Sequence, residues 1–240
     1  MKPQVIEETR NWVAINKPPN LVVHDVPGNK HAGSTLVDWL RRQIPEINDN
    51  FESADERPGI VHRLDADTSG IILVAKNPNS LKELQTQFKE RTTIKKYWAL
   101  VLGTPPAQGT ITGDIVRKSS DTKHEIKRLS FSWDKKAAKM AETSYKVLKT
   151  YQSNFSLLEV QPKTGRTHQI RVHLSEEGWP IIGDQLYCNK ESRQASAELD
   201  LKRQFLHAKK LEFNDPESKE RITIQAQLAP DLEQILKRLE

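Results

Sequence analysis

Strand-like and helix-like segments alternate along this 240-residue chain without the regular rhythm of a parallel βαβ fold. Strand patterns cover 71–75, 97–102, 143–149 and 155–160, and the segments 211–213 and 222–226 flank a turn typical of a hairpin. Helix patterns cover 34–44, 80–91, 169–177 and 230–239. Ser34 is the expected N-cap of the first helix, and Ser80 and Glu83 have capping-box spacing at the second. This order favours an α+β fold over a doubly wound one.

The chain has the features of a soluble protein. No window approaches the roughly 18 consecutive apolar residues of a membrane span, and no apolar signal stretch follows the first residues. The only cysteine, Cys188, excludes an intramolecular disulfide and any multi-cysteine metal site. We therefore expect a cytoplasmic protein, and the lack of a linker-like segment predicts one domain over residues 1–240.

Several familiar chemistries are absent from the sequence. There is no G-x-G-x-x-G, Walker A, H-E-x-x-H or G-x-S-x-G motif. His168 and His173 are five residues apart, so on a helix they would differ in direction by about 140° and could not bind one ion from the same face. The sequence thus predicts neither a metal site nor a bound cofactor.

The positive charge is concentrated in one stretch of the chain. The whole sequence has a net charge of +5, whereas the stretch from Arg117 to Lys149 alone carries +6. Basic side chains alternate there with Phe131, Trp133 and Tyr145, which suits a phosphate backbone and stacked bases. A solvated face is the alternative reading.

The most informative segment is the polar loop Gly59–Gly70, which runs directly into the apolar strand 71–75. A polar loop beside a buried strand places acidic and basic side chains at a strand edge, where a rigid scaffold can direct them at a ligand. The alternative is a turn in which Asp65, Asp67 and their neighbours bond only to local backbone groups. The residues alone do not decide between these two readings.

This loop resembles a known family motif. The string HRLDADTSG, residues 62–70, is similar to the H-R-L-D-x-x-T-S-G motif of the RluA family of RNA pseudouridine synthases. The segments 158–174 and 180–184, Lys96-Tyr97 and Asn16-Lys17-Pro18 agree with the family in order and spacing. The resemblance covers about residues 5–228. It implies an α+β fold with a mixed, largely antiparallel sheet flanked by helices and loops, and a catalytic cleft across the sheet.

The resemblance also implies three catalytic residues. Asp65 is the expected catalytic carboxylate, which either stabilises or captures cationic character at C1′ of the target uridine or assists proton removal. Tyr97 is expected to pack against the target base, and Arg166 to pair with the aspartate and keep it ionised. The pattern leaves position 67 open, so Asp67 is interpreted as a turn residue.

Further residues are implied to contact RNA. Arg63 is expected near the displaced nucleotide, and His62 either binds phosphate or supports the loop. Thr167, His168 and Arg171 start a helix whose N-terminus favours a phosphate. Lys123, Lys127 and Arg128 are the expected RNA contacts of the basic stretch.

The partner implied is ribosomal or transfer RNA, bound by a monomer. Because Asn16-Lys17-Pro18 lies so near Met1, we expect none of the S4-type domains that many relatives carry at the N-terminus. Asn20 replaces a frequent family glycine in a turn that Asn is expected to maintain. The segment 189–202 is a polar insertion of unknown role. The alternative function is a catalytically silent RNA-binding or ribosome-assembly protein on the same scaffold.

Overall fold

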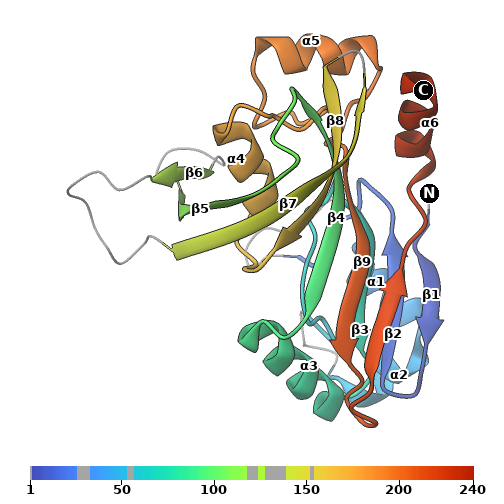
Figure 1. Ribbon diagram of the computed structural model, residues 1–240. Coiled ribbons are helices and arrows are strands. Elements are labelled where there is room, and N and C mark those ends of the chain that lie inside the picture. Colours follow the sequence, from blue (N-terminus) through green and yellow to red (C-terminus); the bar gives the residue numbers. More distant parts are fainter. Residues whose placement is uncertain (1, 26–32, 53–56, 118–123, 128–138, 152–153) are drawn as a thin grey trace. The chain divides into compact units, whose positions relative to one another are not determined.

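The computed structural model describes residues 2–25, 33–52, 57–117, 124–127, 139–151 and 154–240. The chain divides into two compact units, each built on its own strands (Figure 1). Unit 1 contains Met1–Ile94 and Ala208–Ala229, and unit 2 contains Lys95–His207 and Pro230–Glu240. Helices accompany largely antiparallel strands in both, so the expected α+β fold is confirmed.

Unit 1 has strands in the order β1-β2-β3-β9, with β10 paired to β9. Its elements are β1 (Gln4–Glu8), β2 (Trp12–Lys17), α1 (Leu36–Gln43), α2 (Pro45–Asn50), β3 (Ser69–Ala75), α3 (Pro78–Glu90), most of β9 (Leu206–Asn214) and β10 (Arg221–Gln225). The antiparallel pairing of β9 with β10 confirms the expected hairpin.

The β2 strand separates two apolar clusters in unit 1. Val13 and Ile15 pack with side chains of α1 and α2 on one face. Trp12 and Ala14 pack with Leu84 of α3 on the other. Because successive side chains of a strand point to opposite faces, β2 and the fully buried β3 are apolar on both sides.

The expected helices form, but both predicted N-caps were wrong. Thr35 caps α1 and forms a capping box with Asp38, one residue after the expected Ser34. Asn77 caps α3 by accepting a hydrogen bond from the Ser80 N–H. Pro at the first position of a helix needs no N–H partner, so α3 begins at Pro78, ahead of the predicted start.

Unit 2 has strands in the order β4-β8-β7-β5-β6. Its elements are β4 (Ile94–Leu102, from Lys95 onward), β5 (Gln108–Arg117), β6 (His124–Lys127), β7 (Lys139–Tyr151), β8 (Phe155–Pro162), α4 (Gln169–Glu176), α5 (Lys190–Glu198) and α6 (Pro230–Leu239). The α5 helix lies within the polar insertion 189–202. Its buried side chains, Ser192, Ala195 and Ser196, are small or polar and produced no apolar periodicity.

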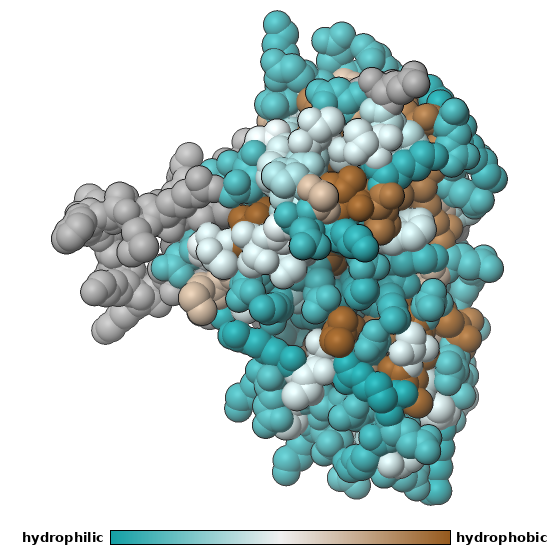
Figure 2. Space-filling view, in the orientation of Figure 1, coloured by the Kyte–Doolittle hydropathy of each residue, from teal (hydrophilic) through white to brown (hydrophobic). Residues whose placement is uncertain are grey.

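Polar side chains cover much of the surface drawn in Figure 2. Among the described helices, none is both long and apolar enough to cross a membrane. Within the same part of the chain, no three His, Cys, Asp or Glu side chains gather in a group that could hold a metal ion.

His173 of α4 is a fully buried ionisable residue. Neither of its ring nitrogens has a hydrogen-bond partner among the described residues. Burial lowers the pKa of His173 from 6.5 to about 4, because the charged imidazolium would lose its hydration. The residue is therefore neutral in the folded protein near pH 7.

This burial predicts an acid-sensitive fold. Between pH 6.5 and 4, His173 is protonated in the unfolded chain but neutral in the folded protein. Because protons bind preferentially to the unfolded chain, the free energy of unfolding falls as the pH falls. The contribution of His173 to this fall is about 3 kcal/mol. Denaturant unfolding at several pH values should show a correspondingly weaker pH dependence for His173→Leu. Parallel curves for the two proteins would contradict the assignment.

Candidate active site

The loop Gly59–Gly70 enters β3 of unit 1 through a close backbone approach. Gly70 has φ +111°, and a Cβ atom there would lie 2.4 Å from the Ala208 carbonyl oxygen of β9. A side chain cannot fit in that space, and the backbone angle also favours glycine. Gly70 thus fixes the point at which the polar loop becomes a buried strand.

A buried ammonium group holds the centre of this loop. Lys17, at the end of β2, is fully buried, and its Nζ donates hydrogen bonds to the carbonyl oxygens of Pro18 at 2.9 Å, Leu21 at 3.0 Å and Ala66 at 2.8 Å. The Leu21 N–H also donates to the Ala66 carbonyl oxygen. Lys17 therefore ties the turn after β2 to the residue next to Asp65.

The turn after β2 contains the residue that departs from the family pattern. Asn20 has φ +57°, in the left-handed region that Asn tolerates better than most residues. The expectation that Asn can maintain this turn is confirmed.

His62 connects the loop to its scaffold. Its Nε2 accepts a hydrogen bond from the Leu73 N–H at 3.0 Å, and its ring stacks on Phe88 of α3 with centroids 4.6 Å apart. Both contacts support the loop, which favours that alternative for His62. A phosphate contact by His62 stays a prediction.

The charged residues of the loop differ in exposure. Arg63 is exposed, whereas Asp65 and Asp67 are half-buried. The Thr68 N–H donates to the Asp65 carbonyl oxygen at 3.1 Å, which closes a turn around residues 66 and 67. This hydrogen bond uses the backbone carbonyl oxygen of Asp65.

In unit 2, Tyr97 belongs to a transverse row of residues on one sheet face. Tyr97 of β4 pairs with Val160 of β8, Val160 with Tyr145 of β7, and Tyr145 with Gly109 of β5. Tyr97 and Tyr145 are both buried, two strand spacings or about 10 Å apart. Tyr145 packs edge-on against Trp179, so it is a packing residue and offers no exposed stacking surface.

Arg166 lies in the turn between β8 and α4. Its Nε is buried and has no hydrogen-bond partner among the described residues. Its backbone N–H donates to Oε1 of Gln169 at 3.1 Å. The buried Gln169 also accepts a 2.6 Å hydrogen bond from the Thr164 hydroxyl, so two residues of the turn are bonded to it.

His168 precedes α4 in a left-handed conformation, with φ 54°. Its Nδ1 lies 3.0 Å from the Tyr187 hydroxyl, and the two rings meet edge-on. His168 and its neighbour Thr167 lie in the turn that leads into α4. Phosphate binding by these two residues stays a prediction.

Arg171 is buried in a bidentate ion pair. Its Nε and Nη2 donate to Asp184 at 2.6 and 2.9 Å, and its guanidinium lies over the Tyr187 ring. Burial raises the pKa of Asp184, but the hydrogen bonds and charge of Arg171 and two backbone N–H donors outweigh it and lower the pKa overall. Arg171 thus stabilises unit 2, and RNA contact by this residue is a prediction without structural support.

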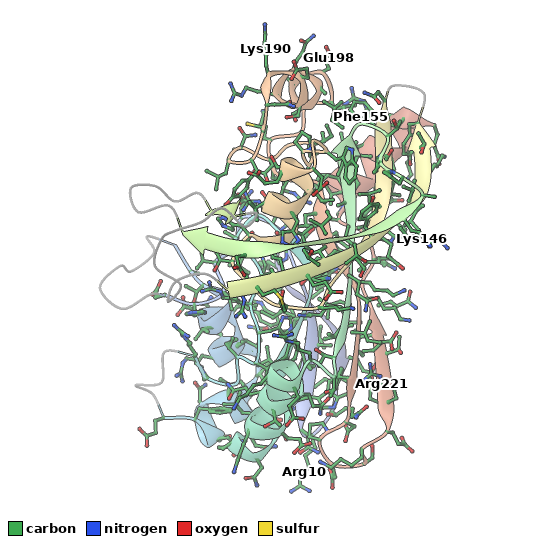
Figure 3. The ribbon with its side chains drawn as sticks, turned by 60° about the vertical axis from the view of Figure 1, so that its left-hand side comes forward. Arg10, Lys146, Phe155, Lys190, Glu198 and Arg221 are labelled. Atoms are coloured by element: carbon green, nitrogen blue, oxygen red, sulfur yellow. The ribbon has the colours of Figure 1, made fainter. Side chains whose placement is uncertain are left out.

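Most of the basic stretch has no described side chains. Lys123 and Arg128 lie outside the described residues, as do Phe131 and Trp133, and Lys127 is described only as the last residue of β6. Lys146 is exposed, and its side chain points away from β7 (Figure 3). Lys149 pairs with Glu240 at 3.0 Å.

The candidate residues fall into one group in each unit. His62, Arg63 and Asp65 share the loop of unit 1, and Tyr97, Arg166, Thr167, His168 and Arg171 belong to unit 2. Sequence reasoning missed the supporting roles of Lys17 and Gln169. A lysine at the end of an apolar strand was a signal for the first, whereas a glutamine in a polar turn gives none.

The chain is similar to known proteins over most of its length. The family model described as RNA pseudouridylate synthase matches residues 11–176. An uncharacterized RNA pseudouridine synthase of Chloroflexus aurantiacus is 42% identical, with 94% of this chain and 66% of that protein aligned. The ribosomal large subunit pseudouridine synthase D of Borreliella burgdorferi is 39% identical, with 88% of this chain and 60% of that protein aligned. The chain thus spans less than two thirds of either relative.

Solved structures agree with these sequence matches. The structure of human RNA pseudouridylate synthase domain containing 4 superposes with a TM-score of 0.75 at 27% identity. The match covers 98% of this chain and 92% of the human one.

The hydrogen bonds of Lys17 lead to a stability prediction. Lys17→Met removes this donor from three carbonyl oxygens, and we expect it to lower the free energy of unfolding by roughly 3 kcal/mol. Amide hydrogen exchange should rise for residues 65–68. Lys209→Met is the control, because the Lys209 ammonium donates to the Ala226 carbonyl oxygen, outside the loop. Unchanged exchange at 65–68 in Lys17→Met would refute the holding role.

Proposed function

This chain belongs to the RNA pseudouridylate synthase family, and we propose that it converts uridine in RNA to pseudouridine. The observation that carries the proposal is the HRLDADTSG motif, which precedes and enters the buried β3 within the matched residues 11–176. In this reaction the bond between N1 and C1′ breaks, the uracil turns while bound, and C5 bonds to C1′. A proton leaves C5 and one is gained at N1, so no cofactor is needed.

Asp65 is the proposed catalytic carboxylate. An ionised carboxylate suits a reaction that develops positive charge at C1′, because it can stabilise or capture that carbon, and it can also accept a proton. The half-burial of Asp65 and the support of its loop by Lys17 and His62 favour a fixed carboxylate. A fixed position matters, because catalytic groups act only within a few tenths of an ångström of the productive geometry.

Tyr97 and Arg166 complete the proposed set. Tyr97 is buried, and we propose that its apolar ring packs against the uracil when the target nucleotide is bound. The Arg166 guanidinium would pair with Asp65 and keep it ionised, as the family motif implies. We propose that both groups meet the target nucleotide in a cleft across the sheet.

We propose large-subunit ribosomal RNA as the substrate. The support is the 39% identity with the ribosomal large subunit pseudouridine synthase D of Borreliella burgdorferi. A uridine in folded RNA must be unstacked before its C1′ is accessible, and the exposed Arg63 beside Asp65 is suited to the displaced nucleotide. The basic stretch, with Lys123, Lys127 and Arg128, supplies phosphate contacts.

The domain organisation, the oligomeric state and the cellular location belong to the same proposal. The chain would act as one catalytic domain over residues 1–240, as a monomer, in the cytoplasm where ribosomes are assembled. The catalytically silent alternative has no observation in its favour, because positions 65, 97 and 166 all hold the residue types that the reaction uses.

The catalytic role of Asp65 can be tested with a matched pair of variants. Asp65→Asn should reduce pseudouridine formation at least about 1,000-fold, because the amide can neither stabilise charge nor accept the proton. Asp67→Asn, which changes the same charge two residues away, should keep nearly full activity. The measurement is tritium release from C5-labelled uridine in large-subunit RNA. Activity retained in a folded Asp65→Asn protein would refute the assignment, and inactive wild-type protein would favour a silent RNA binder.

RNA binding by the basic stretch predicts a salt dependence. Replacing Lys123, Lys127 and Arg128 by Gln should reduce the slope of log Kd against log salt by about 2 to 3, as expected for three lost phosphate contacts. The control replaces the exposed Lys190, Arg193 and Lys202, which alters the net charge equally. Filter binding between about 50 and 300 mM salt measures the slope for both triple variants. Equal slopes in the two triple variants would mean that net charge alone attracts the RNA.

A further inference from the structure

The buried side-chain amide of Gln169 takes part in four hydrogen bonds. Its Oε1 accepts from the Thr164 hydroxyl at 2.6 Å and from the Arg166 N–H at 3.1 Å. Its Nε2 donates to the Glu142 carbonyl oxygen at 2.9 Å and to the Thr143 hydroxyl at 3.0 Å. One side chain thus joins the turn before α4 to strand β7.

Both backbone polar groups of Arg166 are bonded to this one residue. The Arg166 N–H donates to the Gln169 side chain, and the Arg166 carbonyl oxygen accepts from the Gln169 N–H at 3.2 Å. The side-chain half of this arrangement has the spacing of a capping box, in which the third residue after a cap reaches back to the N–H of the cap. The peptide groups on either side of the Arg166 Cα are therefore held from the same point.

The neighbouring hydrogen bonds connect that point to the sheet. The Glu142 N–H donates to the Thr164 hydroxyl at 3.3 Å, and the Lys163 N–H donates to the Glu142 carbonyl oxygen at 2.9 Å. Thr143, Thr164 and Gln169 are all buried, so water does not compete for these bonds. These hydrogen bonds attach the turn before α4 to strand β7.

The side chain of Arg166 lacks an equivalent anchor at its Nε, which is buried and has no partner among the described residues. The hydrogen bonds of the Arg166 backbone fix the direction of the Cα–Cβ bond, from which the side chain leaves the turn. A buried, unpaired donor costs about 1–3 kcal/mol, and a turn that was free to move would relieve it. The Gln169 contacts oppose that relaxation.

We infer that Gln169 is a positioning residue, which fixes the backbone of Arg166 so that the guanidinium meets its acceptor in the reacting complex. The inference rests on the proposed function, because it assumes that Arg166 acts in pseudouridine formation. Gln169 does not touch the RNA in this role. Its effect on the reaction passes through Arg166.

The test compares two buried glutamines whose side chains form hydrogen bonds with backbone groups of another residue. In unit 1, Gln87 accepts from the Asn214 N–H and donates to the Asn214 carbonyl oxygen, both at 2.8 Å. Gln169→Met and Gln87→Met should both lower the melting temperature. Only Gln169→Met should slow the single-turnover reaction at saturating RNA, by about 10- to 100-fold, with little change in the Kd for RNA. Equal rates for the two folded variants would overturn the positioning role.

A double-variant cycle tests whether the effect passes through Arg166. In an Arg166→Ala background, Gln169→Met should cause little additional loss of rate. A full 10- to 100-fold loss in that background would show that Gln169 acts elsewhere and would overturn the inference. Should Gln169→Met fail to fold, Thr164→Val removes one donor of the network and should slow the reaction about 3- to 10-fold.

Failure of the proposed function can be distinguished from failure of the inference about Gln169. Wild-type protein that forms no pseudouridine in any RNA refutes the function itself. A normal rate for Arg166→Ala in an active enzyme refutes the role of Arg166, and with it this inference. An active wild type, a slow Arg166→Ala and a normal Gln169→Met refute the inference alone.

Discussion

The Lys17 ammonium is the contact on which the loop carrying Asp65 depends. Removing an ammonium group from water costs several kcal/mol, and the charge is offset here by carbonyl dipoles, three of which accept its hydrogen bonds. Those carbonyl groups belong to segments distant in sequence, 18–21 and 66, so the ammonium joins them in one arrangement. His62 and Gly70 then fix the two flanks of the loop against β3 and β9. The loop is thus held at its centre by one buried charge and at its flanks by His62 and Gly70.

The two groups of candidate residues, one in each unit, are held by different chemistry. The loop of unit 1 depends on a charged donor, whereas the turn of unit 2 depends on the neutral amide of Gln169 and two threonine hydroxyls. Arg171 and Asp184 add a buried ion pair to the following helix, α4, without sharing a hydrogen bond with Gln169. In each unit the supporting residue is buried and the residue it supports carries the charge proposed to act.

Sequence patterns predicted several of the elements whose burial is one-sided or complete, although they missed the buried strand β2. The apolar run 71–75, the amphipathic segment 80–91 and the hairpin around residue 214 all formed as expected, because their periodicity reflects the face that packs. Helix starts were less predictable, because Asn77 and Thr35 compete for the caps with serines one to three residues away. The α5 helix was missed because small polar side chains make up its buried face. The family resemblance proposes Asp65, Tyr97 and Arg166 as site residues, and their roles stay predictions. Lys17 and Gln169 hold backbone groups, and of these two only the lysine, at the end of an apolar strand, left a signal in the sequence.

The neutrality of the Gln169 network has a consequence for how the protein responds to its ionic surroundings. Dissolved ions screen interactions between charges but leave a buried amide and hydroxyl network almost untouched. Attraction of a polyanion to basic side chains is weakened by the same ions. Added salt should therefore weaken RNA binding without changing the turn that carries Arg166. Fewer complexes form, but in each of them Arg166 lies on an unaltered turn.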